Sequence, residues 1–356
     1  MLVHGPPRRA TNITRSRTSC KFYRPWDMIL AVSTVCCMAL LLVLVAGERV
    51  AADVLEDAIA AAAAQARQGD FESAIATLKN QLLPGLDGGT RIRILGMLGD
   101  VELSAGRSED ALARYQEILI LDPKEGRAHY KKGMVLKSRV ATLREAIESF
   151  EAAIENGYAP SSAFSSLGFC YKAAVDFELA EPAQRADYLR RAEANFSKAV
   201  QLDSDNLSAR GNLADLYFNA GRYTEAIAEY EKLRGKIPGD LTVVVRLGRA
   251  YLGADRIAEG LEALRVAERD YVPPSRTLPP EEFFPKLDVG TALYWSLANV
   301  ALKQGRSDDA VAYLNRLLAI SECPGCAHES VRTTESRRKA MDLLERLQGA
   351  KVPPPR

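Results

Sequence analysis

Small and large apolar residues recur along the chain in a pattern that repeats about every 34 residues. One unit begins with the pair Leu98-Gly99, continues with Ala111 twelve positions later and reaches Tyr115 four positions after that. Equivalent leading pairs end at Gly133, Gly168, Ala214, Gly248 and Ala298. Three of the intervals between these small residues are 34 or 35 residues long. The spacing predicts a helical hairpin that is repeated along the chain.

The residue types fit two antiparallel helices in close contact. A small residue on each helix lets the backbones approach, and the large residue one turn later fills the remaining space. The turns within hairpins read "AGRSED", "AGRYTE" and "QGRSDD", in which glycine suits a helix end and Ser, Thr or Asp suits the next helix cap. "LDPKEG" and "KIPGD" separate the hairpins, and their prolines stop one helix or start the next.

Two stretches depart from the repeat. The hairpin with Gly168 and Ala192 has 24 residues between them instead of 12, which predicts helices about three turns longer in total, with a bend near Pro182. The second departure is the proline-rich insertion 271–286, "YVPPSRTLPPEEFFPK". Its five prolines exclude a continuous helix and favour an extended crossing over the array. An ordered loop explains this crossing more simply than a recognition element does.

The C-terminal part predicts one more helix. In residues 330–348, Ala340, Leu343, Leu344 and Leu347 share one face, and basic residues occupy the rest. Such a helix would seal the open end of an array. The predicted fold is therefore all-α: about seven hairpins over residues 53–320 in a right-handed α-solenoid, a loop at 321–328 and a capping helix at 330–348. The alanine-rich residues 60–64 begin a degenerate first unit.

The repeated residues resemble the tetratricopeptide repeat family, which has small residues at two set positions, an aromatic residue after the second and a proline near the end. Residues 207–240 match through Leu213, Ala214, Tyr217, Ala226, Tyr230 and Pro238, and residues 92–125 match through Leu98, Gly99, Ala111, Tyr115 and Pro123. The resemblance covers roughly residues 53 to 320 and rests on several units. It implies a non-catalytic protein that binds other proteins.

A membrane segment is predicted before the array. Residues 28–47, "MILAVSTVCCMALLLVLVAG", carry no charge and would span about 30 Å as a helix, the thickness of a bilayer's hydrocarbon core. A basic tail precedes it at residues 1–27, with an excess of five positive charges, and acidic residues follow it. This asymmetry predicts a cytoplasmic N-terminus and an array on the periplasmic or other extracytoplasmic side.

Two other interpretations of this segment remain open. It could be a cleaved signal peptide, because "VAG" and "VAA" offer small residues to a peptidase. The apolar run exceeds the roughly 7 to 15 residues usual for a signal core, which favours a retained signal-anchor. Met28 could also be the true start, which would remove the basic tail. A lipoprotein anchor is not expected, since "LVAG" is followed by Glu48 rather than cysteine.

Charge and composition narrow the range of partners. The chain of 356 residues has 47% hydrophobic residues, few aromatics and a net charge of +1, so the part after the basic tail is mildly acidic. This balance argues against nucleic acid as the partner, which would need a basic face. No motif for nucleotide, metal or nucleophile chemistry accompanies His129, so enzymatic activity and a small-molecule substrate are not expected and no cofactor is predicted.

The resemblance also implies where a partner would bind. In this family the first helices of the hairpins line a groove that holds an extended peptide or a helix. By motif position, the groove residues here are Arg93, Asp100, Arg127, Tyr130, Met134, Lys137, Ser165, Phe169, Lys172, Asp215, Phe218, Asn219, Arg246 and Arg249. Basic and apolar groups alternate in this set, which suits an acidic or C-terminal segment with apolar anchors. The family's clamp for a chaperone tail is not reproduced.

The stretch "CPGCAH", residues 323–328, is the chain's one cluster of thiols and imidazole. Haem attachment would need His328 directly after Cys326, and a closed zinc site would need a fourth ligand. Outside the cytoplasm a small disulfide or an inert loop clasp is favoured over redox exchange or metal binding. Cys170, within a first helix, is expected to be a buried small hydrophobe.

These features predict a membrane-anchored scaffold or assembly factor that holds other proteins through its groove. The resemblance to membrane-tethered repeat proteins of cytochrome maturation or envelope-polymer export favours an assembly role. The alternative function is a thiol-active accessory factor in cytochrome or envelope biogenesis, in which Cys323 and Cys326 exchange electrons or bind a metal.

Overall fold

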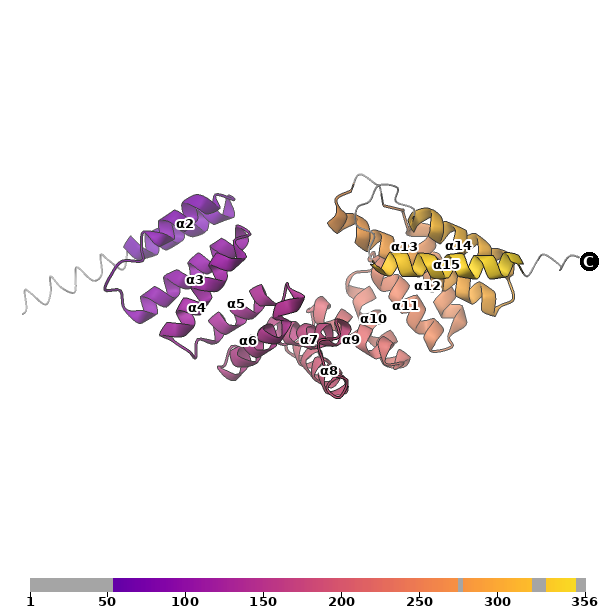
Figure 1. Cartoon of the computed structure of the whole chain (residues 1–356), viewed down its shortest axis with the longest axis horizontal. Helices are drawn as coiled ribbons and strands as arrows, with labels where there is room; N and C mark the ends of the chain where they lie inside the picture. Colours follow the sequence, from indigo (N-terminus) through magenta and orange to yellow (C-terminus); the bar gives the residue numbers. More distant parts are fainter. Residues whose placement is uncertain (1–53, 275–277, 322–330, 350–356) are drawn as a thin grey trace, which may run out of the picture. The chain divides into compact units, whose positions relative to one another are not determined.

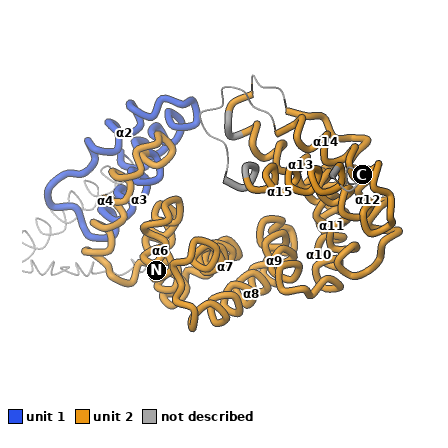
Figure 2. The backbone as a smooth tube through the Cα atoms, turned by 45° about the vertical axis from the view of Figure 1, so that its right-hand side comes forward, with its two compact units in different colours: residues 1–101 blue, residues 102–356 orange. Residues whose placement is uncertain are grey.

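The computed structural model describes residues 54–274, 278–321 and 331–349, and every regular element in these ranges is a helix (Figure 1). The chain divides into two compact units, residues 1–101 and 102–356 (Figure 2). Residues 54–67, α2 (Phe71–Lys79) and most of α3 (Gly88–Ser104) lie in unit 1. The helices of unit 2 are α4 (Ser108–Leu121), α5 (Gly126–Leu136), η1 (Val140–Thr142), α6 (Leu143–Glu155), α7 (Ser161–Asp176), α8 (Arg185–Leu202), α9 (Leu207–Asn219), α10 (Tyr223–Lys236), α11 (Leu241–Gly253), α12 (Ile257–Asp270), α13 (Pro280–Lys303), α14 (Ser307–Ser321) and α15 (Val331–Gly349).

Unit 2 is a stack of helical hairpins, as the spacing predicts. The hairpins are α5 with α6, α7 with α8, α9 with α10, α11 with α12, and α13 with α14, and each packs on the next along the chain. The helices within a hairpin touch at the small residues. A methyl group on Gly168 would lie 3.0 Å from the ring of Phe196 and 3.1 Å from the carbonyl oxygen of Ala192. The predicted close approach is therefore confirmed, and glycine is required for it.

The core of unit 2 is built from the residues that repeat. Ala146, Ala192 and Ala226 are fully buried, and so are the rings of Phe150 and Phe196. The predicted large residues thus fill the space between neighbouring backbones, and the alternation of alanine with aromatic rings keeps the interior densely packed without long runs of aliphatic residues.

The turns inside the hairpins depart in part from the predicted caps. Glycine takes the left-handed conformation after the first helix, as at Gly221 with φ of +74°. The residue at the N-cap is arginine rather than Ser, Thr or Asp, and it makes no side-chain cap hydrogen bond at Arg222 or Arg256. Each guanidinium instead bonds the carboxylate three residues later, Glu225 or Glu259. Arginine therefore tethers the start of the second helix by an ion pair across its first turn.

The long hairpin has a loop as well as longer helices. α7 has 16 residues and α8 has 18, against 13 and 14 in the next hairpin. The two helices together are therefore about two turns longer than those of the next hairpin, rather than the predicted three. The remaining residues form the connection that contains Pro182, where the backbone at Glu178 takes a positive φ of 58°. Pro182 therefore lies in a loop between the helices, because its ring and missing N–H are tolerated there.

The second half of the proline-rich insertion is helical. α12 ends at Asp270, and α13 begins at Pro280 and contains Pro285. Pro280 is tolerated at the first helical position because the N–H group there would have no partner within the helix. Pro285 lies beyond the first turn, where it removes one hydrogen bond of the helix. Tyr271 anchors the segment that follows α12: it is buried, and its hydroxyl donates to the Lys286 carbonyl at 3.2 Å. Residues 271–274 have no regular structure, and residues 275–277 lie outside the described residues, so the extended crossing stays a prediction there.

The last helix packs as predicted. α15 contacts α14 and α13, with Ala340 and Leu344 buried and Leu343 and Leu347 packed against the same cluster. Its apolar face covers the end of the last hairpin. Among the described residues, none of the helices combines the length and the apolar character needed to cross a bilayer. The predicted membrane segment, residues 28–47, and the basic tail 1–27 lie outside the described residues.

Candidate functional site

A pocket of about 680 Å³ lies across the first helices of three successive hairpins in unit 2. α5 contributes Tyr130 and Met134 together with Lys137 at its end, α7 contributes Ser165 and Phe169, and the start of α9 contributes further polar groups. These five residues all belong to the predicted groove. The structure therefore brings together one continuous part of it, on helices that are fixed by packing on both sides.

Hydroxyl groups form the floor of this pocket. Ser165 and Ser166 are both buried in α7, and the Ser166 hydroxyl donates to the Met134 sulfur at 3.6 Å. The Tyr130 hydroxyl donates to Ser162 at 3.1 Å, and its ring lies 5.2 Å from that of Tyr158. Tyr130 is therefore held by contacts on both its ring and its hydroxyl.

Two phenyl rings, one on α7 and one directly after its last residue, are open to solvent. Phe169 is 42% exposed and Phe177, at the end of α7, is 56% exposed, and both line the pocket. Exposed aromatic rings beside buried hydroxyls provide an apolar surface next to hydrogen-bonding groups. Such a combination is common at sites that bind proteins or small molecules.

Lys137 supplies the charge of the pocket. Its ammonium donates to the Ser166 hydroxyl at 3.4 Å. Burial of the side chain lowers the pKa of Lys137 from its usual range. No carboxylate in the described part of the chain lies within ion-pair distance of this ammonium, although neighbouring cations have such partners. A partly buried cation without a counter-ion attracts an anion from outside.

A smaller pocket of about 210 Å³ lies further along unit 2. Phe218 and Arg249, both predicted groove residues, line it together with residues of α13 that include Asn299 and Lys303. The Arg249 guanidinium lies 5.0 Å from the centre of the Phe218 ring. The arginine thus stacks on the phenyl ring, which fixes its position.

Other predicted groove residues bond to groups of this chain. Arg246 pairs with Asp215 at 2.8 Å, and the buried hydroxyl of Tyr230 donates to the same carboxylate. Lys172 pairs with Asp176, one helical turn away. The Arg246–Asp215 pair joins α11 to α9, and the Lys172–Asp176 pair lies within α7. A partner would have to compete with these existing contacts to reach the four charged groups.

The remaining predicted residues lie elsewhere. Arg93 and Asp100 belong to unit 1, where Arg93 pairs with Glu56 at 2.5 Å and both side chains are largely exposed. Arg127, in the first turn of α5, and Asn219, at the end of α9, are exposed. None of these four lines either pocket.

Models of known families match several parts of the chain. Two models, both described as tetratricopeptide repeat, match residues 186–240 in one case and residues 97–140 and 245–325 in the other. The matched residues span roughly half of the chain. The chain belongs to the tetratricopeptide repeat family. Proteins of this family generally act as scaffolds for protein interactions. No curated protein matches this chain significantly in sequence.

Solved structures are similar to this chain, and one of them reaches a TM-score of 0.50. A tetratricopeptide repeat protein from Parabacteroides merdae ATCC 43184 is 16% identical, with a TM-score of 0.50 over 81% of this chain and 98% of that one. YrrB, a tetratricopeptide repeat protein with an unusual peptide-binding site, is 24% identical, with a TM-score of 0.44 over 56% of this chain and 91% of that one. PilW, a type IV pilus biogenesis factor, is 15% identical, with a TM-score of 0.49 over 63% of this chain and 96% of that one. At these identities the likeness extends to the fold alone.

The sequence pattern missed part of the larger pocket. Phe177, Ser162 and Asn212 line it and were not among the predicted residues. Asn212 is one turn before Asp215 on the same helix, so the helical spacing contained the signal for it. Phe177 follows α7 in the connection that is particular to the long hairpin, and no repeat position corresponds to it.

The predictions for the cysteines and the histidines have different outcomes. Cys323, Cys326 and His328 lie outside the described residues. Cys170 is fully buried, and burial raises the pKa of its thiol to about 12, so it behaves as the small hydrophobe that was expected. His129 is half-buried, and one ring nitrogen lies 2.9 Å from the Pro123 carbonyl oxygen, so it joins α5 to the preceding loop.

Proposed function

We propose that this tetratricopeptide repeat protein is a scaffold that holds an extended segment of another protein in the pocket formed by α5, α7 and α9. The observation that carries the proposal is the exposure of Phe169 and Phe177 beside a floor of hydroxyl groups. Exposed rings of this kind cost free energy in water, and a partner's apolar side chain would remove that cost. The family's usual role in protein interactions supports this assignment.

The pocket suits a segment without regular structure of its own. Its lining comes from successive hairpins whose helices do not need to move, so the site is formed before the partner arrives. A preformed site reduces the ordering cost on the side of the scaffold, and the partner alone loses conformational freedom. Side chains that alternate along an extended segment could reach the phenyl rings and the hydroxyl floor in turn.

The membrane anchor is part of the proposal. Its support is the uncharged run at residues 28–47, which is long enough to cross a bilayer, and the basic residues before it. A scaffold confined to a membrane meets membrane-bound partners at a raised effective concentration. Membrane flotation of the full chain, beside a chain that begins at residue 48, tests this part. Recovery of both forms in the soluble fraction would contradict the anchor, and N-terminal sequencing of the full chain would reveal cleavage.

The binding role is tested by crosslinking and mass spectrometry of the full chain in its native membrane. A double variant, Phe169→Ala with Phe177→Ala, removes the exposed rings of the pocket. The matched control, Leu189→Ala with Leu202→Ala, removes two apolar side chains of similar exposure from α8. We expect a protein that is crosslinked to the wild type and to the control, and lost from the pocket variant. Equal crosslinking to all three forms would contradict the proposal.

A further inference from the structure

The charge of the larger pocket indicates what kind of segment it binds. Lys137 contributes a positive charge, and no aspartate or glutamate is among the residues that line this pocket. Two other cations on the first helices of unit 2 are neutralised within the chain: Lys172 by Asp176, and Arg246 by Asp215. A buried or partly buried cation is ordinarily paired, because removal from water without a partner is costly. Lys137 departs from that rule at a place that is open to a ligand.

The immediate surroundings of Lys137 fit an anion that also accepts hydrogen bonds. The ammonium already contacts Ser166 at 3.4 Å, and the Ser166 hydroxyl now donates only to the sulfur of Met134, which is a weak acceptor. A carboxylate between the two groups would accept from the ammonium and from the hydroxyl. Hydrogen bonds to charged groups of this kind are among the stronger ones in proteins.

The apolar half of the site is fixed relative to this cation. Phe169 follows Ser166 by three residues on α7, so the two side chains lie on one face of the helix, and Phe177 follows two turns later. A segment whose carboxylate reaches Lys137 would therefore present a neighbouring side chain to the phenyl rings.

We propose that the pocket recognises an extended protein segment by one aspartate or glutamate side chain, bound at Lys137 and Ser166, together with a large apolar side chain packed on Phe169 and Phe177. This inference rests on the proposed scaffold function and adds the chemistry of the partner. A side-chain carboxylate is favoured over a chain terminus for a structural reason. Capture of a terminal carboxylate by free backbone N–H groups is not available here, because Ser165 and Ser166 lie inside α7, where the backbone is bonded within the helix. The side-chain clamp of this family for a chaperone tail is not reproduced either.

The test begins with selection of peptides by the full chain. The probe is a display library of random peptides that are fused at both ends, so that no free terminus is present. We expect the enriched peptides to carry Asp or Glu close to a large apolar residue. A synthetic copy of an enriched peptide is then compared with its Glu→Gln (or Asp→Asn) form, and both are measured against five proteins: wild type, Lys137→Met, Lys137→Arg, Lys198→Met and Phe169→Ala. Lys198 is an exposed lysine of α8 and provides the matched control.

The inference predicts a specific coupling between lysine and acid. Loss of either the Lys137 ammonium or the peptide carboxylate is expected to weaken binding about tenfold or more, which is the size of a charge-assisted hydrogen bond. When both are lost, the affinity should fall little further than when one is lost. Lys137→Arg should retain most of the affinity and Lys198→Met all of it. Thermal unfolding of each variant verifies that the fold is intact.

Three outcomes would overturn the inference. The enriched peptides could lack a carboxylate and bind Lys137→Met as well as the wild type, yet depend on Phe169. This result would contradict the carboxylate site and would remain consistent with a scaffold that binds a different kind of segment. If this library gives no binder, and a second library of peptides with a free C-terminus does, the side-chain carboxylate would be replaced by a terminal one. Enrichment that does not depend on Phe169 would contradict both the inference and the proposed function.

Discussion

The ring of Phe150 lies against the backbone of Gly133, so that a methyl group on the glycine would be 2.9 Å from the nearest ring carbon. The two residues belong to the helices of one hairpin, and the ring is fully buried. The contact is the physical basis of the repeat: each hairpin closes because a small residue of the first helix accepts a large residue of the second.

We therefore expect Gly133→Ala to destabilise unit 2 by about 1–3 kcal/mol, because the added methyl group overpacks a closed interface. Gly211→Ala is the matched control. Gly211 also lies inside a first helix, but a methyl group there would be 3.7 Å from its nearest neighbour, an ordinary contact. The control should gain stability of up to about 1 kcal/mol from the better helix propensity of alanine. Urea unfolding midpoints measure both changes, and equal effects at the two sites would contradict this account of the hairpin contact.

Asp255 takes the place that glycine occupies in the other turns. Its φ is +61°, close to the values at Gly221 and Gly305. A left-handed backbone costs residues with a Cβ about 1–2 kcal/mol, less for aspartate than for most, and glycine escapes that cost. Asp255→Gly is therefore expected to raise the free energy of unfolding by up to about 1 kcal/mol, while Asp255→Ala should lower it. Denaturant titrations distinguish the three forms, and an alanine variant as stable as the glycine variant would refute the role of the backbone.

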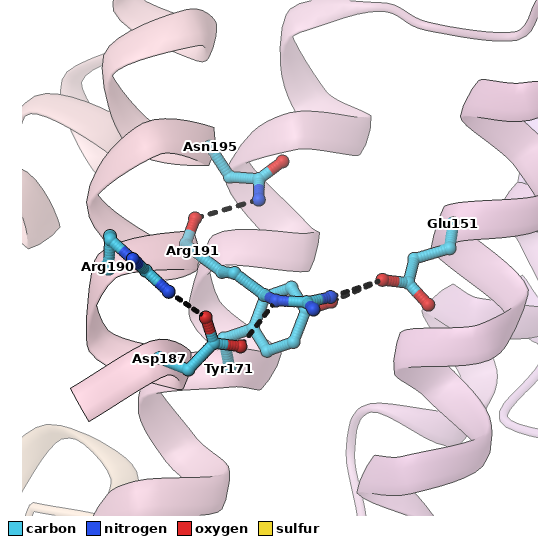
Figure 3. A network of polar contacts seen from close by, with 6 residues as sticks. All are labelled: Glu151, Tyr171, Asp187, Arg190, Arg191 and Asn195. Carbon is cyan, nitrogen blue, oxygen red and sulfur yellow. Dashed lines mark hydrogen bonds and ion pairs between the residues drawn. The ribbon is translucent and has the colours of Figure 1, made fainter. Parts of the chain in front are cut away.

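The long hairpin is held by a polar network that predicts a pH dependence (Figure 3). The Arg191 guanidinium donates to the Tyr171 hydroxyl at 3.1 Å and to Asp187 at 2.7 Å, and the Tyr171 hydroxyl donates to Glu151. Burial, followed by the bond to Glu151, raises the pKa of Tyr171 to about 12. An unfolded tyrosine titrates near pH 10.

The folded chain thus keeps the Tyr171 proton between about pH 10 and pH 12, while the unfolded chain loses it, so stability must fall as the pH rises through this range. Burial also raises the pKa of the buried Tyr294 and the partly buried Tyr313, so both add to the same fall in stability. In Tyr171→Phe the free energy of unfolding should decrease less between pH 10 and pH 12, although the variant is less stable than the wild type at pH 8. Unfolding free energies measured at intervals from pH 8 to 12 test this. Parallel curves for the two proteins would show that Tyr171 does not contribute.

The fold was predictable from the sequence because each repeat has the same spacing of small and large residues. The glycine or alanine of the first helix, the small residue of the second and the large residue after it recur together from unit to unit, although Leu264 and Leu314 replace the aromatic residue in the last two. Each unit therefore supports the assignment of the others. The caps were predicted less well. Arg222 holds its turn by an ion pair to Glu225, and sequence patterns for helix caps consider only short polar side chains.

The site was predictable in outline only. Motif position placed Lys137 and Phe169 correctly near one another, because both follow from the helical period. It did not reveal that Arg246 is neutralised by Asp215 from the preceding hairpin, since a contact between hairpins depends on their stacking. Nor could it reveal Phe177, which lies in a connection outside the repeat. The predicted roles of Cys323 and Cys326 stay predictions, as these residues lie outside the described ranges.

Site-specific photocrosslinking tests the central claim most directly. A photoreactive phenylalanine at position 162, at the exposed N-terminal end of α7 in the pocket, is compared with the same group at position 189 on α8 in the full chain in its native membrane. We predict a defined crosslinked protein from position 162 that is absent from position 189 and disappears in the Phe169→Ala, Phe177→Ala background. The same product from both positions, or its persistence without the two rings, would contradict binding in the pocket of α5, α7 and α9.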